Sequence, residues 1–158
     1  MRKAFLSLCI FLFAHSAFAQ EGDVNNIGSW ITTENKTKEQ YTVFMVDDEE
    51  DNVLFIICAK RSLQIALLVE ALPSSKNGII DVQVKWGNQR ISKAEWLFND
   101  GGAIILLTDI ERKAFVKNVL KHDKLAISFR IGKNDMNSTF EFEETKKALQ
   151  QITKNCPI

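Results

Sequence analysis

The sequence predicts an α+β fold: an antiparallel β-sandwich or curled sheet with two helices, the C-terminal helix tethered by a disulfide. Alternating apolar and polar residues separated by turn signals dominate residues 30–108. Apolar residues at helical spacing then follow after residue 108 and again near the C-terminus. Two cysteines lie in apolar positions of a predicted strand and of the last helix. The length of 158 residues, with 46% hydrophobic and 25% charged residues, suits one globular domain.

The first nineteen residues have the pattern of a secretory signal peptide. A basic start, Met1-Arg2-Lys3, precedes the apolar run Ala4–Ala14, and Ala17-Phe18-Ala19 supplies the small-residue cleavage motif. The apolar run is shorter than the about 20 residues that a membrane span needs. We therefore predict a signal peptide over 1–19, cleavage after Ala19, and a single exported domain over 20–158 without a transmembrane segment.

Three strands are predicted in the first half of this domain. Tyr41–Val46 is β-branched and aromatic, and Val53–Cys58 is apolar on both faces, which indicates a central strand that is covered on both sides. Ser62–Ala71 fits a strand or a helix. We predict a strand, because every second residue from Leu63 to Val69 is apolar and Lys60-Arg61 is a plausible hairpin link.

Further strands follow in hairpins. Asn77-Gly78 is a tight-turn signal, and the next strand alternates apolar and polar residues up to Trp86. Lys93–Phe98 is the next predicted strand. It leads into a turn over residues 99–102 and a strand over Ala103–Leu107.

The hydrophobic period changes at residue 108. Thr108 and Glu111 form a capping box that opens a helix to about His122. Strands are then predicted over residues 125–131 and around residues 140–142, before a last helix from about Glu144 to Asn155. The apolar stripe of this helix continues to Cys156, which therefore faces the sheet. Cys58 and Cys156 are the cysteines that remain after cleavage, and in an oxidising compartment they most simply form one disulfide.

The chemistry of the remaining residues points away from catalysis. No HExxH, CxxC, GxSxG, Walker A or GxGxxG motif occurs after residue 19. His122 is the one histidine of the exported part, and at a helix C-terminus it more often complements the helix dipole than acts as a catalyst. The formal net charge of zero gives no drive toward nucleic acid. We predict a non-enzyme with no cofactor and no metal.

One acidic run is the candidate partner-binding site. It joins two predicted strands and consists of Asp47, Asp48, Glu49, Glu50 and Asp51. The run lacks the spacing and the glycine of an EF-hand, and such runs are most often solvated turns. Trp30, Trp86 and Trp96 are a second candidate, as a ligand platform, although Trp86 shares a strand face with apolar residues and this favours a core position.

Taken together, the pattern resembles the VasI-like family of type VI secretion-associated exported proteins from Gram-negative bacteria. The resemblance covers most of residues 20–158 and rests on Gly28-Ser29-Trp30, Cys58, Trp96, Asp100, Phe115, Leu120, Leu125, Thr139-Phe140, Ala148-Leu149 and Cys156. The terminal cysteine departs from that family's pattern, because Pro157-Ile158 follow it. The resemblance implies a periplasmic accessory protein and gives no catalytic residue to carry over.

These observations predict a non-enzymatic periplasmic accessory or binding protein of an envelope secretion or virulence system. It would act through contacts with a protein partner in the cell envelope. The alternative is a periplasmic immunity or inhibitor protein that blocks an exported toxin or hydrolase. An exposed acidic loop, such as residues 47–51, would indicate this function. A hydrolase, as a third class, would need a pocket of polar residues around His122 or around paired acids.

Overall fold

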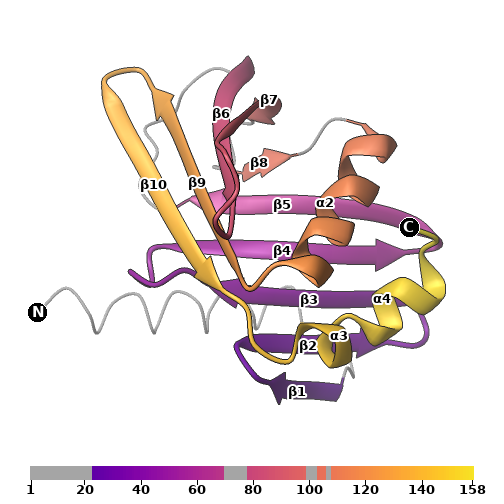
Figure 1. The fold of residues 1–158 in the computed structure, drawn as a ribbon. Coiled ribbons are helices and arrows are strands. Elements are labelled where there is room, and N and C mark those ends of the chain that lie inside the picture. Colours follow the sequence, from indigo (N-terminus) through magenta and orange to yellow (C-terminus); the bar gives the residue numbers. More distant parts are fainter. Residues whose placement is uncertain (1–22, 70–77, 99–102, 106–107) are drawn as a thin grey trace, which may run out of the picture.

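The computed structural model describes residues 23–69, 78–98, 103–105 and 108–158 (Figure 1). In this part of the chain, ten strands form an antiparallel sheet and three short helices pack against it. The predicted α+β class, with a curled sheet, is confirmed. The predicted signal peptide and the predicted turn at 99–102 lie outside the described residues. So do Asn77 of the predicted turn Asn77-Gly78, and the ends, at 70–71 and 106–107, of two predicted strands.

The first half of the sheet is a five-stranded meander. Its strands are β1 (Asp23–Ile27), β2 (Trp30–Asn35), β3 (Gln40–Val46), β4 (Asn52–Ala59) and β5 (Ser62–Val69). The ambiguous segment after residue 61 is therefore a strand over Ser62–Val69, and each of these residues pairs with β4. Lys60 and Arg61 form the predicted hairpin link. Both have positive φ, as the two central residues of a type I′ turn do, and the backbone of such a turn matches the twist of the strands that it joins. Strands β1 and β2 were not predicted as separate elements.

The second half contains β6 (Gly78–Trp86), β7 (Ser92–Phe98), β9 (Lys124–Ile131) and β10 (Asn134–Glu141). The short β8 (Ala103–Ile105) pairs with β5 on one side and β7 on the other. It joins the two halves in the order β1-β2-β3-β4-β5-β8-β7-β6-β9-β10. Strands from distant parts of the chain thus form one hydrogen-bonded sheet, whose edges are β1 and β10.

The helices are α2 (Asp109–Lys121), α3 (Thr145–Ala148) and α4 (Gln150–Asn155). The predicted capping box opens α2: the Glu111 N–H donates to Thr108 Oγ1 over 3.2 Å, and the Thr108 N–H donates to Glu111 Oε2 over 2.8 Å. The single last helix predicted from Glu144 is instead split in two. Leu149 has a ψ of 3°, far from the α-helical value, and its fully buried side chain holds this bend against the core.

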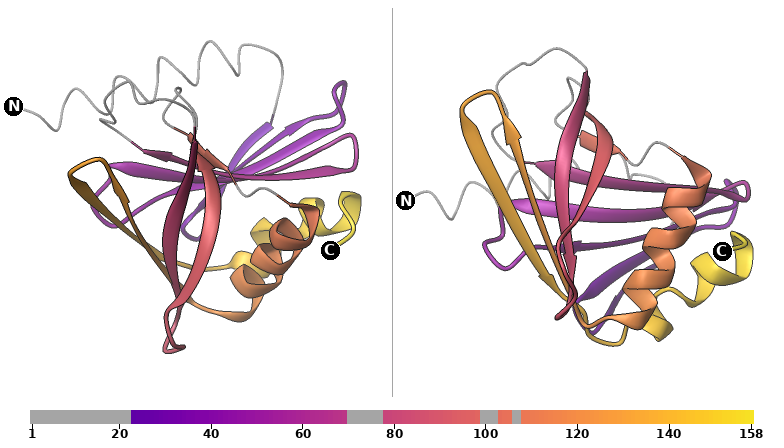
Figure 2. Two further views of the ribbon diagram at one scale, coloured as in Figure 1. Left: turned by 90° about the horizontal axis from the view of Figure 1, so that it is seen from above. Right: turned by 45° about the horizontal axis from the view of Figure 1, so that its top comes forward.

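The core lies between the two halves of the sheet. Figure 2 shows the helices on one side of β1–β5, on the side toward which β6, β7, β9 and β10 turn. Helix α2 contacts β5, α3 contacts β2, and α4 contacts β3 and β4. The fully buried side chains from both halves and from the helices include Trp30, Ile56, Ile65, Val82, Ile127, Phe140, Leu149 and Ile152. No helix of the described residues combines the length and the apolar character that crossing a membrane requires.

Candidate functional site

The acidic run occupies the hairpin loop between β3 and β4, and its first residue is part of the structure of that loop. Asp47 is only 4% exposed. Its carboxylate accepts hydrogen bonds from the Asp51 N–H over 3.0 Å, from the Asn52 N–H over 3.2 Å and from Asn52 Nδ2 over 2.7 Å. A buried carboxylate that accepts several N–H donors fixes the backbone around it. Asp47 therefore holds the loop closed and is not a surface contact residue.

The other four acidic residues are exposed. Asp48, Glu49, Glu50 and Asp51 form the outer part of this loop, which we call the acidic loop. Glu50 has a φ of 62°, and its N–H donates to the Asp47 carbonyl over 3.0 Å. The side chains of the loop thus project from a backbone that is held by a buried carboxylate and by local hydrogen bonds.

The acidic loop is also attached to the second half of the sheet. The Asp48 N–H donates to the Thr139 carbonyl of edge strand β10 over 3.0 Å. This bond joins the β3–β4 hairpin to a residue 91 positions later in the chain (139 − 48). The loop is therefore fixed at its base by Asp47 and at its side by β10, so its charges keep a defined position relative to both halves of the fold.

One cationic group lies close to this loop. Lys124 Nζ is 2.8 Å from Glu141 Oε1 in an exposed ion pair. The hydrogen bond from Glu141 raises the pKa of Lys124 above its ordinary value, and the carboxylates of Asp48 and Asp123 add to this effect. The lysine is thus engaged by Glu141 and neutralises only part of the acidic surface. A basic partner would meet an excess of negative charge here.

His122, the candidate for catalysis in a hydrolase, lies at the end of α2. Its N–H donates to the Asn118 carbonyl over 2.9 Å, and its ring lies 6.1 Å from the Trp86 ring. Its Nε2 has no hydrogen-bond partner among the described residues. Two surface hollows of about 420 and 510 Å³ meet at this residue, together with Lys121 and Asp123. Thr145 Oγ1, in the first hollow, accepts a hydrogen bond from Trp30 Nε1 over 3.3 Å.

The three tryptophans belong to the core. Trp30, Trp86 and Trp96 are at most 7% exposed. Trp30 stacks on Phe142 with ring centroids 5.4 Å apart, and Trp86 makes an edge contact with Phe115 at 5.0 Å. They do not form a surface platform. For Trp86 this agrees with the core position that its apolar neighbours on the strand favoured.

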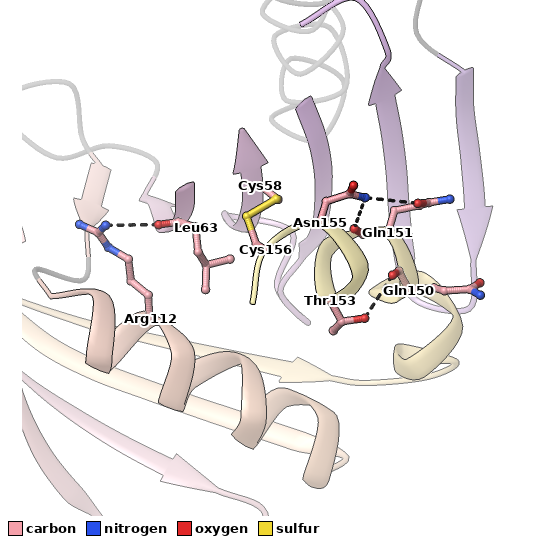
Figure 3. Close-up of a disulfide and its surroundings, with 8 residues drawn as sticks. All are labelled: Cys58, Leu63, Arg112, Gln150, Gln151, Thr153, Asn155 and Cys156. Atoms are coloured by element: carbon pink, nitrogen blue, oxygen red, sulfur yellow. Dashed lines mark hydrogen bonds between the residues drawn. A yellow bond between two sulfur atoms is a disulfide. The ribbon is translucent and has the colours of Figure 1, made fainter. Parts of the chain in front are cut away.

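The predicted disulfide between Cys58 and Cys156 is present, with Cα atoms 5.8 Å apart. Figure 3 shows the bond joining the end of α4 to β4. Both cysteines are buried. In the same region, Asn155 Nδ2 donates to the Gln151 carbonyl over 2.8 Å, and Arg112 of α2 donates to the Leu63 carbonyl of β5 over 3.2 Å. The helices are therefore held on the sheet by a covalent bond and by a polar contact.

Among the described residues, no group of three or more His, Cys, Asp or Glu side chains is placed to hold a metal ion. No family model, no curated protein and no solved structure matches the chain. The resemblance to VasI-like proteins therefore stays a prediction.

Sequence reasoning missed two residues that shape the acidic loop. Asn52 pairs with Asp47, and Thr139 receives the loop on β10. Asp47 and Asn52 stand at the two ends of a hairpin loop, and this spacing could have indicated the role of Asn52. The reason is that Asp at a turn commonly accepts hydrogen bonds from backbone N–H groups that follow it. The contact with Thr139 depends on how the two halves of the sheet pack, and no local pattern indicates it.

Proposed function

We propose that this protein is a non-enzymatic, exported binding protein of an envelope secretion or virulence system, and that the acidic loop contacts its protein partner. The observation that carries the proposal is the position of Asp47. Its buried carboxylate and the Asp48–Thr139 bond order the loop before any partner arrives. A loop that is already ordered loses less conformational entropy on binding, so more of the contact energy appears as affinity.

The location in the cell envelope rests on two supports. One is the predicted signal peptide over residues 1–19. The other is the Cys58–Cys156 disulfide, since structural disulfides form and persist in oxidising compartments. The predicted resemblance to VasI-like proteins adds the secretion system to this proposal.

The partner surface that suits the acidic loop is basic. Asp48, Glu49, Glu50 and Asp51 present four exposed carboxylates, and complementary charges speed association and fix the orientation of a complex. Because the charges are exposed, we expect partner binding to weaken as salt is added.

A second candidate function rests on the rigidity of the same loop. Inhibitors of enzymes commonly present a pre-organised segment that changes little on binding. An acidic loop held at its base and at its side would suit insertion into the basic active site of an exported toxin or hydrolase. In that case the protein would be an immunity or inhibitor protein, and its partner would be a single enzyme in a stoichiometric complex.

The test is in-cell cross-linking of the tagged full-length protein, followed by capture from the periplasmic fraction and mass spectrometry. The double variant Glu49→Lys, Glu50→Lys reverses two charges of the acidic loop. The matched control, Asp81→Lys with Glu95→Lys, reverses two exposed charges that face each other on β6 and β7. We expect secretion or envelope proteins in the wild-type and control captures, and their loss in the loop variant.

The same experiment separates the alternatives. Recovery of one toxin or hydrolase in equal amount would make this an immunity protein. Equal recovery of the partner with the loop variant and the control would show that the acidic loop is not the contact surface. Inhibition of a captured hydrolase by the wild-type protein would be measured directly with the purified pair.

A further inference from the structure

A small hollow of about 300 Å³ lies at the end of the β3–β4 pair that is opposite to the acidic loop. Its walls come from four parts of the chain: Glu39 before β3, Tyr41 on β3, Arg61 in the β4–β5 turn, and Lys154 with Asn155 at the end of α4. Sites for small molecules are concave and gather a few polar groups in this way, and about 300 Å³ is the lower end of their size range. The hollow is therefore large enough for a small ligand.

The disulfide fixes two of these walls relative to each other. Tyr41 is the register partner of Cys58, and Asn155 directly precedes Cys156. The bond between the two cysteines, whose Cα atoms are 5.8 Å apart, thus joins the β3–β4 wall to the α4 wall. Figure 3 shows Asn155 beside this bond, with its Nδ2 donating to the Gln151 carbonyl over 2.8 Å. Because the walls are held before a ligand arrives, binding costs less conformational entropy.

Two turns that meet at the hollow contain residues in the left-handed region. Glu39 has a φ of 49°, Lys60 of 48° and Arg61 of 66°. The Lys60 N–H donates to the Glu39 carbonyl over 3.1 Å and so joins the two turns. A two-residue hairpin turn of this type normally carries Asn and Gly, which adopt positive φ at lower cost. Non-glycine residues that are held in this region cluster at ligand sites, and the Arg61 side chain lines the hollow.

The charged groups of the hollow favour an anion with a single charge. Arg61 and Lys154 supply two positive charges, and Glu39 supplies one negative charge. The guanidinium group of Arg61 matches a carboxylate in bidentate geometry, and the Tyr41 hydroxyl is a hydrogen-bond donor. Among the described residues, no ion pair engages Arg61 or Lys154, and no hydrogen bond engages the Tyr41 hydroxyl. These three side chains are therefore available to a ligand.

We propose that this hollow binds the carboxylate group of a small ligand, with Arg61 and Lys154 as its cationic partners and Tyr41 as a neutral donor. A phosphate monoester is also an anion, but it carries a charge of about −1.5 to −2 at pH 7. Glu39 repels that charge more strongly than the single charge of a carboxylate. Carboxylates of this kind occur at the end of a peptide chain and in sugar acids.

The experiment is an NMR titration of the protein purified from the periplasmic fraction of cells that express the full chain. The probes are N-acetylalanine, its uncharged amide, glucuronate and methyl phosphate. Arg61→Gln removes one positive charge from the hollow. Lys60→Gln is the matched control, because it removes the same charge from the neighbouring residue of the same turn, which does not line the hollow. Tyr41→Phe removes the hydroxyl alone, and circular dichroism checks that all three variants are folded.

We expect the carboxylate probes to shift the amide signals of residues 39–41, 61 and 154–155 in a saturable way, and the uncharged amide to leave them unchanged. Arg61→Gln should weaken this binding about tenfold or more, because a hydrogen bond between charged groups is lost, and Tyr41→Phe should weaken it by a smaller factor. Lys60→Gln should bind like the wild type. Tighter binding of N-acetylalanine would identify a peptide end as the ligand, and tighter binding of glucuronate would identify a sugar acid.

Several results would overturn the proposal. Among them are the absence of saturable shifts with either carboxylate, equal binding of N-acetylalanine and its amide, and tighter binding of methyl phosphate than of both carboxylates. Equal affinity of Arg61→Gln and the Lys60→Gln control would also overturn it, because the Arg61 side chain would then make no contact of its own. None of these outcomes depends on the acidic loop, so this inference can fail while the proposed function holds.

Discussion

Asp47 and Asn52 face each other across the ends of β3 and β4, and the Asn52 side-chain amide donates to the Asp47 carboxylate over 2.7 Å. Both side chains are buried, and Asn52 Oδ1 has no hydrogen-bond partner among the described residues. The pair closes the hairpin whose outer part is the acidic loop. Its integrity therefore decides whether the loop charges are held in place.

Replacing Asp47 by Ala should destabilise the fold by about 2–3 kcal/mol, because the N–H groups of Asp51 and Asn52 and the Asn52 amide lose their acceptor. Asp47→Asn is the matched control and should cost less than about 1 kcal/mol. Its side-chain oxygen still accepts the two backbone bonds, and a flip of the Asn52 amide turns Oδ1 toward the new NH₂ group.

Urea unfolding measures both variants, and hydrogen exchange reports on the Asp51 and Asn52 amides directly. We expect fast exchange of these two amides in Asp47→Ala and slow exchange in Asp47→Asn. If the alanine variant unfolds at the same urea concentration as the wild type, the buried carboxylate does not hold the loop.

Much of the fold could be predicted from local pattern, because side chains at period 2 or 3.6 report the face that each element buries. The apolar residues Leu63, Ile65 and Leu67 identify β5 as a strand, and Thr108 with Glu111 marks the start of α2. The split at Leu149 could not be predicted this way. It results from fitting a buried side chain and a tethered cysteine against the sheet, which is a tertiary effect.

The candidate surfaces were harder to predict than the fold. The sequence identifies the acidic run but does not show that Asp47 turns inward, because an exposed and a buried carboxylate look alike in sequence. Val53–Cys58 is apolar on both faces, which predicted a strand covered on both sides. In the structure the residues of this strand alternate between buried and half-buried, and the helices lie on the side of the buried ones.

The disulfide should contribute about 4–5 kcal/mol to stability on the chain-entropy model, since it closes a loop with a sequence separation of 98. Urea unfolding of the oxidised protein, compared with the Cys58→Ala, Cys156→Ala double variant, measures this contribution. The double variant should unfold identically with and without reductant, which controls for other effects of the reductant. Two free sulfhydryls from positions 58 and 156 in the denatured, unreduced protein would contradict the bond itself.

Arg130 and Asp135 form an exposed ion pair between β9 and β10, with Arg130 Nε 2.5 Å from Asp135 Oδ1. The hydrogen bond from Arg130 lowers the pKa of Asp135 below its ordinary value. A carboxyl whose folded pKa lies below its unfolded pKa favours the folded state above the unfolded value, and this contribution is lost as the pH falls through the folded pKa. The relevant window is therefore acidic, below about pH 4.

An NMR titration of the Asp135 carboxyl carbon measures this pKa. Arg130→Gln should return the pKa of Asp135 to its ordinary range. Arg130→Lys should give an intermediate pKa, because lysine keeps the positive charge and loses the bidentate hydrogen bonding of arginine. An unchanged midpoint in Arg130→Gln would show that the ion pair does not persist in solution.

Gly28 and Gly132 allow a matched test of how tightly the two halves of the fold meet. Both have positive φ, +58° and +62°, so a side chain at either position is strained by about 1–2 kcal/mol. A Cβ at Gly28 would also lie 2.5 Å from the Glu143 carbonyl oxygen, whereas a Cβ at Gly132 would meet nothing within 4 Å. The Glu143 N–H donates to Ser29 Oγ over 3.0 Å, so this backbone cannot move away without losing that bond. We expect Gly132→Ala to lower the free energy of unfolding by the backbone strain alone. Gly28→Ala should lower it by about 1–3 kcal/mol more, because its Cβ overpacks the turn. Thermal and urea unfolding of the two variants give the difference, and equal losses would mean that the β1–β2 turn does not pack against the segment after β10 in solution.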